Sequence, residues 1–141
     1  MFKPEFIVLH HSATKDSGLT VSWGGIRNYH LVEKQWRDVG YHYGIEDVHG
    51  HYEILLGRMV GEEGAHCIGM NKRSIGICCV GNFDLDAPED KLWQTCMNLV
   101  RHLMAQHKIP STNVLGHREC TGYDRTCPGK FWNMGLFRSL L

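Results

Sequence analysis

The hydrophobic residues of the chain form several short runs that are typical of strands. Residues 6–10 and 74–81 are apolar and partly β-branched, and each run ends at polar residues or glycine. These features indicate two buried strands, the second of which has the length of a central strand. Residues 41–46 and 52–56 flank a turn that contains Gly50, so they predict a hairpin. A further short strand is expected at residues 113–115.

Apolar residues at helical spacing predict three helices, at residues 22–33, 87–107 and 131–137. In the first of them, Gly24 and Gly25 each weaken the helix by about 1 kcal/mol relative to alanine. Strands that alternate with helices indicate the α/β class. We therefore expect a single α/β domain over residues 1–141, with a mixed central β-sheet flanked by helices.

The pattern for the second helix includes signals for its two ends. Asp86 and Glu89 have the spacing of an N-terminal capping pair, and Pro88 suits the first turn. Pro110 stops the pattern at the other end. This helix is predicted to begin at Ala87.

Composition and charge narrow the functional classes. The chain has 141 residues, the size of one ordinary domain, and its 15 basic residues balance 15 acidic ones. A formal net charge of zero gives no global field that would attract nucleic acid. No apolar run approaches the roughly 18 residues of a transmembrane helix, and no signal-peptide pattern stands at the N-terminus. We expect a monomeric cytoplasmic protein with no nucleic-acid partner and no membrane insertion.

Ten histidines and six cysteines are the unusual feature of the composition. His117 and Cys127 bracket a polar loop, and imidazole with thiolate is a suitable ligand pair for zinc. His10 would be a third ligand at the end of the first strand, which leaves an open fourth position as in catalytic zinc sites. Spacing alone does not distinguish these residues from ordinary loop residues. Neither does it decide between His10 and His11, whose side chains point to opposite faces of a strand.

Four blocks of sequence carry a resemblance to a known family. They are residues 8–14 (VLHHSAT), 36–43 (WRDVGYHY), 64–71 (GAHCIGMN) with 74–77 (SIGI), and 116–119 (GHRE) with 127–129 (CPG). The chain resembles the zinc-dependent N-acetylmuramoyl-L-alanine amidases, a family that includes phage lysozyme-like amidases and the peptidoglycan recognition proteins. The blocks occur in the family's order, and the resemblance extends from about residue 6 to residue 137.

The resemblance implies a ligand set and a catalytic phenol. The family's zinc ligands fall on His10, His117 and Cys127, so one Zn²⁺ ion is expected in a groove at the sheet edge. His11 then becomes a packing residue or a partner of a ligand. Tyr41 matches the tyrosine that the family places beside the metal, where a phenol can hydrogen-bond the developing oxyanion.

Other positions match the family less closely. Arg125 stands where the phage enzymes carry a lysine, and it is a candidate for stabilising the oxyanion, with Thr126 as the alternative donor. His66 and Asn71 fall in the block that resembles the family's substrate-side loop, so they are candidate substrate-binding residues. Cys120 lies inside the loop and is an alternative thiolate ligand.

The function that the resemblance implies is hydrolysis of the amide between N-acetylmuramic acid and L-alanine in peptidoglycan, as a phage or prophage endolysin that acts on the wall after release from the cytoplasm. The recycling amidases of this family usually carry glutamate where the chain has Cys78, which makes muropeptide recycling the weaker alternative. A noncatalytic peptidoglycan-binding module would have lost the cysteine ligand. A small structural-zinc protein would have a closed site of four ligands.

Overall fold

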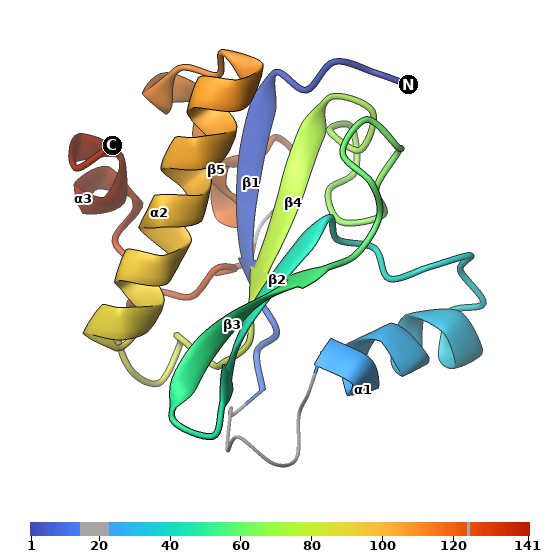
Figure 1. The fold of residues 1–141 in the computed structure, drawn as a ribbon, viewed down its shortest axis with the longest axis horizontal. Coiled ribbons are helices and arrows are strands. Elements are labelled where there is room, and N and C mark those ends of the chain that lie inside the picture. Colours follow the sequence, from blue (N-terminus) through green and yellow to red (C-terminus); the bar gives the residue numbers. More distant parts are fainter. Residues whose placement is uncertain (15–22, 124) are drawn as a thin grey trace.

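A computed structural model describes residues 1–14, 23–123 and 125–141 of the chain (Figure 1). Its strands are β1 (Phe6–His11), β2 (Tyr43–Val48), β3 (His51–Leu56), β4 (Ser74–Cys79) and β5 (Val114–Gly116). Its helices are α1 (Trp23–Asn28), which continues as a π-helical turn over Tyr29–Glu33, α2 (Asp90–His107) and α3 (Met134–Ser139). Short 3-10 turns at Ser111–Asn113 and His117–Glu119 flank β5.

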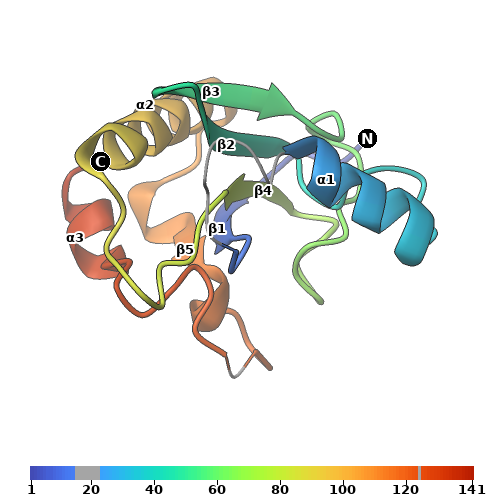
Figure 2. The same cartoon turned by 90° about the horizontal axis from the view of Figure 1, so that it is seen from below.

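The strands form one mixed sheet in the order β3-β2-β4-β1-β5. β1 pairs in parallel with both β4 and β5, β2 is parallel to β4, and β3 runs antiparallel to β2 as the second strand of the expected hairpin. Figure 2 shows α2 and α3 on one side of the sheet and α1 on the other. The predicted α/β class, with a mixed central sheet flanked by helices, is therefore confirmed.

The start of α2 differs from the prediction. The helix begins at Asp90 rather than Ala87, and Glu89 occupies the N-cap position without capping through its side chain. The carboxylate of Glu89 instead accepts a hydrogen bond of 2.9 Å from the hydroxyl of Tyr52 on β3. The tertiary contact to β3 thus replaces the local capping pair that the sequence pattern predicted.

The two faces of the sheet have different roles. Alternate residues of the central strands, including Ile7, Leu9 and Ile77, pack against α2 in the main hydrophobic core. The opposite face carries Val8 and His10 of β1, whose neighbours belong to two smaller clusters. Because side chains alternate along a strand, this second face presents His10 on the side away from α2.

Pairing of β1 with β5 fixes where the polar residues meet. Leu9 lies opposite Gly116 in the parallel register, so His10 and His117 follow at the same end of adjacent strands. Carboxyl ends of parallel strands share one edge of a sheet, where side chains from distant segments converge. Among the described residues, no helix combines the length and the apolar character needed to cross a membrane.

Candidate metal centre and its cavity

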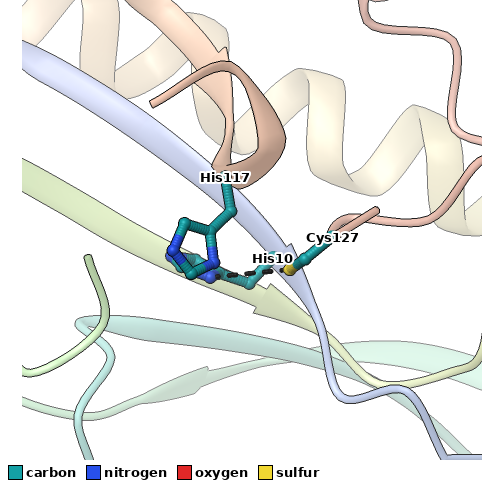
Figure 3. A group of neighbouring side chains, drawn as sticks. All are labelled: His10, His117 and Cys127. Atoms are coloured by element: carbon teal, nitrogen blue, oxygen red, sulfur yellow. Dashed lines mark hydrogen bonds between the residues drawn. The ribbon is translucent and has the colours of Figure 1, made fainter. Parts of the chain in front are cut away.

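Three potential metal ligands meet at the carboxyl ends of β1 and β5. His10 is the penultimate residue of β1, His117 follows β5 directly, and Cys127 comes from the loop that precedes α3 (Figure 3). One ligand atom of each residue lies within 4.8 Å of the others. His10 Nδ1 is 3.7 Å from Cys127 Sγ, close to the roughly 3.5 Å expected between a nitrogen and a sulfur ligand of one tetrahedral zinc ion.

The loop that carries Cys127 is fixed by Arg118. The guanidinium donates hydrogen bonds to the carbonyl oxygens of Thr126, Gly129 and Trp132. The backbone N–H of Arg118 also donates to the carbonyl of Cys127 at 2.7 Å. Arg118 directly follows His117, and its hydrogen bonds thereby hold both ends of the turn that carries Cys127.

Asp84 holds the same turn from outside. Its carboxylate accepts hydrogen bonds from the Thr126 hydroxyl and the Lys130 backbone N–H, both at 2.9 Å. These two bonds lower the pKa of the Asp84 carboxyl. The hydroxyl of Thr126 is therefore committed to Asp84 and is directed away from a role as oxyanion donor.

Burial keeps the three candidate ligands uncharged at neutral pH when no cation balances them. Burial raises the pKa of the Cys127 thiol to about 12 and lowers the pKa of His117 to about 4. The pKa of His10 lies well below its ordinary value, first because of burial and then because of the neighbouring His66 and His117. Neutral imidazole is the form that ligates a metal, and the His11 backbone N–H lies 3.4 Å from Cys127 Sγ, where it stabilises the thiolate.

His11 itself points elsewhere, as expected for neighbours on a strand. Its Nδ1 accepts a hydrogen bond of 3.1 Å from the backbone N–H of Phe83, and its ring stacks on the Phe83 ring with centroids 6.0 Å apart. The structure thus brings His10, and not the side chain of His11, to His117 and Cys127.

Tyr41 lies beside the ligand cluster. Its ring centroid is 5.1 Å from that of His10, and it packs against the cluster that contains the buried Cys78. Burial, and then the adjacent thiols of Cys78 and Cys127, raise the pKa of Tyr41 well above its ordinary value. The phenol therefore remains protonated over the neutral range and is available as a hydrogen-bond donor.

A cavity of about 600 Å³ opens over these residues. Its lining includes the three candidate ligands, Tyr41, His66 and Asn71. Asn71 fixes the loop around His66, because its Oδ1 accepts from the backbone N–H groups of His66 and Cys67 at 2.8 and 2.9 Å. Only the amide nitrogen of Asn71 remains for a ligand in the cavity.

His66 has a different environment from the one its substrate-side block suggests. Nδ1 of His66 lies 2.9 Å from Nε2 of His10, and its Nε2 lies 3.3 Å from Oγ of Ser74. Both ring nitrogens are therefore engaged within the protein. The ring of His66 can contact a molecule in the cavity only through its carbon atoms.

Two predicted site residues are not brought to the cluster. Arg125 is exposed and is not among the residues that line the cavity. Cys120 is buried with Val8 and Cys67, and its thiol contacts the Gly116 carbonyl instead of joining the ligand group. Cys127, and not Cys120, is therefore the loop cysteine that is placed to ligate a metal.

Sequence reasoning missed two residues of the site. Arg118 lies in a block that carried the resemblance, but only the folded loop shows that its guanidinium gathers three carbonyl groups. Tyr123 stacks on His117 with ring centroids 3.5 Å apart and planes inclined by 12°, and it lines the cavity. An aromatic residue between two candidate ligands was the available sequence signal for Tyr123.

Comparisons with known proteins show the family to which the chain belongs. A family model described as N-acetylmuramoyl-L-alanine amidase matches residues 1–130, so the chain belongs to this family. The endolysin of Klebsiella phage KP32 is 34% identical over 125 residues, which cover 86% of this chain and 78% of the endolysin. A solved endolysin N-acetylmuramoyl-L-alanine amidase from Clostridium intestinale has 25% identity and a TM-score of 0.82, over 99% of this chain and 84% of that one.

The chain is also similar to peptidoglycan-recognition proteins. Drosophila melanogaster peptidoglycan-recognition protein LB is 30% identical over 132 residues, which cover 88% of this chain. The chain spans only about half of that protein, 54% of its length. A structure of a variant of the same Drosophila protein in complex with tracheal cytotoxin has a TM-score of 0.76 and 25% identity, over 94% of this chain and 79% of that one.

Proposed function

We propose that this protein is a zinc-dependent N-acetylmuramoyl-L-alanine amidase that hydrolyses the amide between the lactyl group of N-acetylmuramic acid and L-alanine. One observation carries the proposal: ligand atoms of His10, His117 and Cys127 lie within 4.8 Å of one another in the lining of a 600 Å³ cavity. Two imidazoles and a thiol are a donor set that zinc prefers, and three protein ligands leave a position for chemistry.

The three side chains fit one zinc ion, which they would hold at the carboxyl ends of β1 and β5. Zinc bound there supplies a Lewis acid for the scissile carbonyl and lowers the pKa of water toward neutrality. The remaining contributions come from the protein. The His11 backbone N–H donates to the Cys127 sulfur, and Arg118 fixes the turn that carries this sulfur.

Tyr41 is the proposed donor to the developing oxyanion. Its raised pKa keeps the phenolic proton in place, and its ring lies against His10 at the wall of the cavity. A fixed donor stabilises charge that appears only in the transition state, which is where hydrogen bonding accelerates a reaction most. Beneath Tyr41, the buried Cys78 belongs to the hydrophobic cluster against which the tyrosine packs.

The cavity supports a muropeptide as substrate. Most of its lining is apolar or aromatic, with Trp36 and His30 forming an aromatic wall whose ring centroids are 4.7 Å apart. Sugar rings and peptide side chains both pack on such surfaces, while a few polar groups fix orientation. The amide nitrogen of Asn71 and the carbon face of His66 are the proposed contacts of the substrate-side loop.

The arrangement favours catalysis over binding alone, because the thiol of Cys127 and the phenol of Tyr41 are both retained beside His10. A closed structural site is disfavoured because Cys120 packs away from the cluster. Where recycling amidases of the family usually carry glutamate, this chain has a buried Cys78 that contacts Tyr41. These features, with the phage endolysin as a relative, support an endolysin of a phage or prophage that is made in the host cytoplasm.

Digestion of purified peptidoglycan tests this function. The protein is incubated with sacculi, and mass spectrometry follows the release of stem peptides that begin with L-alanine, together with new reducing sugar ends. An amidase releases these peptides without new reducing ends, and the Cys127→Ala variant releases none. Sacculi that bind the wild-type protein but remain intact would contradict hydrolysis and support a noncatalytic module.

A further inference from the structure

A row of hydrogen bonds runs from His10 into the interior of the protein. Nε2 of His10 lies 2.9 Å from Nδ1 of His66, and Nε2 of His66 lies 3.3 Å from Oγ of Ser74. The Ser74 hydroxyl donates to the carbonyl oxygen of Met70 at 2.7 Å. The row begins at Nε2 of His10. The other ring nitrogen of His10, Nδ1, faces the sulfur of Cys127.

The far end of this row fixes the direction of every bond in it. A backbone carbonyl only accepts, so the single hydroxyl proton of Ser74 is committed to Met70. Oγ of Ser74 must then accept from His66, which places the His66 proton on Nε2. Nδ1 of a neutral His66 is left as an acceptor, and the proton between the two rings therefore belongs to Nε2 of His10. His10 is left with an unprotonated Nδ1 that faces Cys127.

The ring of His66 is closely packed, which keeps its two nitrogens aligned with His10 and Ser74. A Cβ atom added to Gly76 would lie 2.6 Å from two atoms of the ring, and one added to Gly64 would lie 2.6 Å from Cδ2. The ring therefore packs against the backbone of Gly64 and Gly76, where a larger residue would clash with it.

We propose that His66, oriented by Ser74, is a positioning residue that holds His10 in the tautomer protonated at Nε2 and so directs the Nδ1 lone pair toward the metal position. Metal-ligating histidines commonly donate their second N–H to a carboxylate, carbonyl or water. Here the imidazole of His66 accepts that N–H, and Ser74 on β4 fixes the tautomer of His66. The inference rests on the zinc site proposed above, and it gives His66 a role beyond contact with substrate.

Two substitutions separate this role from packing. Ser74→Ala removes one oxygen atom, the hydroxyl that accepts from the buried Nε2–H of His66 in the tautomer that serves His10. His66→Asn removes most of a buried ring but keeps an amide oxygen near the position of Nδ1, where it can accept from His10. If His66 positions His10, Ser74→Ala should weaken zinc binding more than His66→Asn does. Packing alone predicts the reverse, because His66→Asn leaves the larger cavity.

The first readout is zinc affinity, measured by competition with a chromogenic chelator. We expect Ser74→Ala to weaken zinc binding by about 10-fold or more, in the range known for partners of metal-ligating histidines. His66→Asn should stay within about threefold of the wild type, while His66→Leu, which has no acceptor, should resemble Ser74→Ala. Wild-type affinity in Ser74→Ala, or a larger loss in His66→Asn than in Ser74→Ala, would overturn the proposal.

The second readout is the tautomer of His10 in the protein without zinc, obtained from the ¹⁵N resonances of its ring. Wild-type protein should show a protonated Nε2 and an unprotonated Nδ1, and Ser74→Ala should increase the Nδ1-protonated form. A protonated Nδ1 in the wild type would overturn the inference even if the enzyme hydrolyses peptidoglycan. Failure of the wild type to bind zinc or to cleave sacculi would instead overturn the proposed function, and the resonances would still report on the hydrogen-bond order.

Discussion

His10 and Cys127 are separated by 117 positions in the sequence, yet Nδ1 of His10 lies 3.7 Å from Sγ of Cys127. Neither residue moves freely into this contact. β1 is paired on both sides in the sheet, and the turn of Cys127 is tied down by Arg118 and Asp84. A preorganised pair of ligand atoms binds a metal ion with little further ordering, which raises affinity.

The two loop cysteines predict opposite outcomes on substitution. Cys127→Ser replaces the proposed thiolate ligand and should reduce both zinc content and hydrolysis by at least about 100-fold. Cys120→Ser alters a thiol that packs with Val8 and Cys67, and it should keep both. Metal analysis of the purified variants and a peptide-release assay measure the two effects. Loss of zinc from Cys120→Ser but not from Cys127→Ser would show that the ligand had been assigned to the wrong cysteine.

Tyr41→Phe tests the oxyanion donor. The substitution removes one hydroxyl and should leave zinc content unchanged, because Tyr41 is not a ligand. We expect kcat to fall by about 10²-fold or more, the usual effect of removing one donor to an oxyanion. Steady-state kinetics on a soluble muropeptide separate this from a change in KM. An unchanged kcat would exclude Tyr41 from stabilising the transition state.

Arg118 and Arg125 form a matched pair on the same loop region. Arg118→Ala removes hydrogen bonds to three carbonyl groups and should lower the free energy of unfolding by about 2 kcal/mol, with weaker zinc binding. Arg125→Ala changes an exposed residue outside the cavity lining, so it should alter the free energy of unfolding by less than about 0.5 kcal/mol and turnover by less than about twofold. Thermal unfolding and activity assays measure both. A large loss of kcat in Arg125→Ala alone would assign Arg125 the role of oxyanion stabiliser.

The ion pair of Glu119 predicts a pH dependence of stability. Partial burial acts to raise the pKa of Glu119, but hydrogen bonds from Arg138 and the Gly116 backbone N–H outweigh it and leave the pKa lowered. A carboxyl whose pKa is lower in the folded state stabilises the fold above its unfolded pKa, near 4.3, and this contribution is lost as the pH falls through the folded pKa.

Denaturant unfolding of the wild type and of Glu119→Gln, both with chelator present, tests the sign. The wild type should be the more stable protein at pH 7, and the difference should shrink as the pH falls below about 4.3 and through the lowered pKa of Glu119. A difference that grows on acidification would contradict the assignment. Glu53→Gln on β3 is a suitable control, because Glu53 pairs with the exposed His51 far from this turn.

Much of the fold follows from residue patterns within single segments. The apolar runs at β1 and β4 have the composition of central strands, and the hairpin of β2 and β3 is marked by the turn at Gly50. The start of α2 was predicted wrongly because local capping signals compete with tertiary contacts. The pattern around Glu89 cannot show that Tyr52, 37 positions away, uses its carboxylate.

The site was predictable to the extent that residue type limits chemistry. Histidine and cysteine at His10, His117 and Cys127 suggested zinc, but the decision between His10 and His11 needed the family resemblance and is visible in the structure through the contacts of each ring. Hydrogen-bond direction could not be predicted, since it depends on the partners of each polar atom. The engagement of both nitrogens of His66 is the clearest example.

Reconstitution of the metal-free protein with zinc is the most direct test of the proposed catalytic site. Protein stripped by a chelator is titrated with Zn²⁺, and the release of L-alanine-terminated peptides is measured at each ratio. A single catalytic zinc predicts no release without metal, a linear recovery that saturates at one zinc ion per chain, and no recovery in His117→Ala. Full activity in the stripped protein, or recovery that needs two ions per chain, would contradict a single catalytic zinc held by His10, His117 and Cys127.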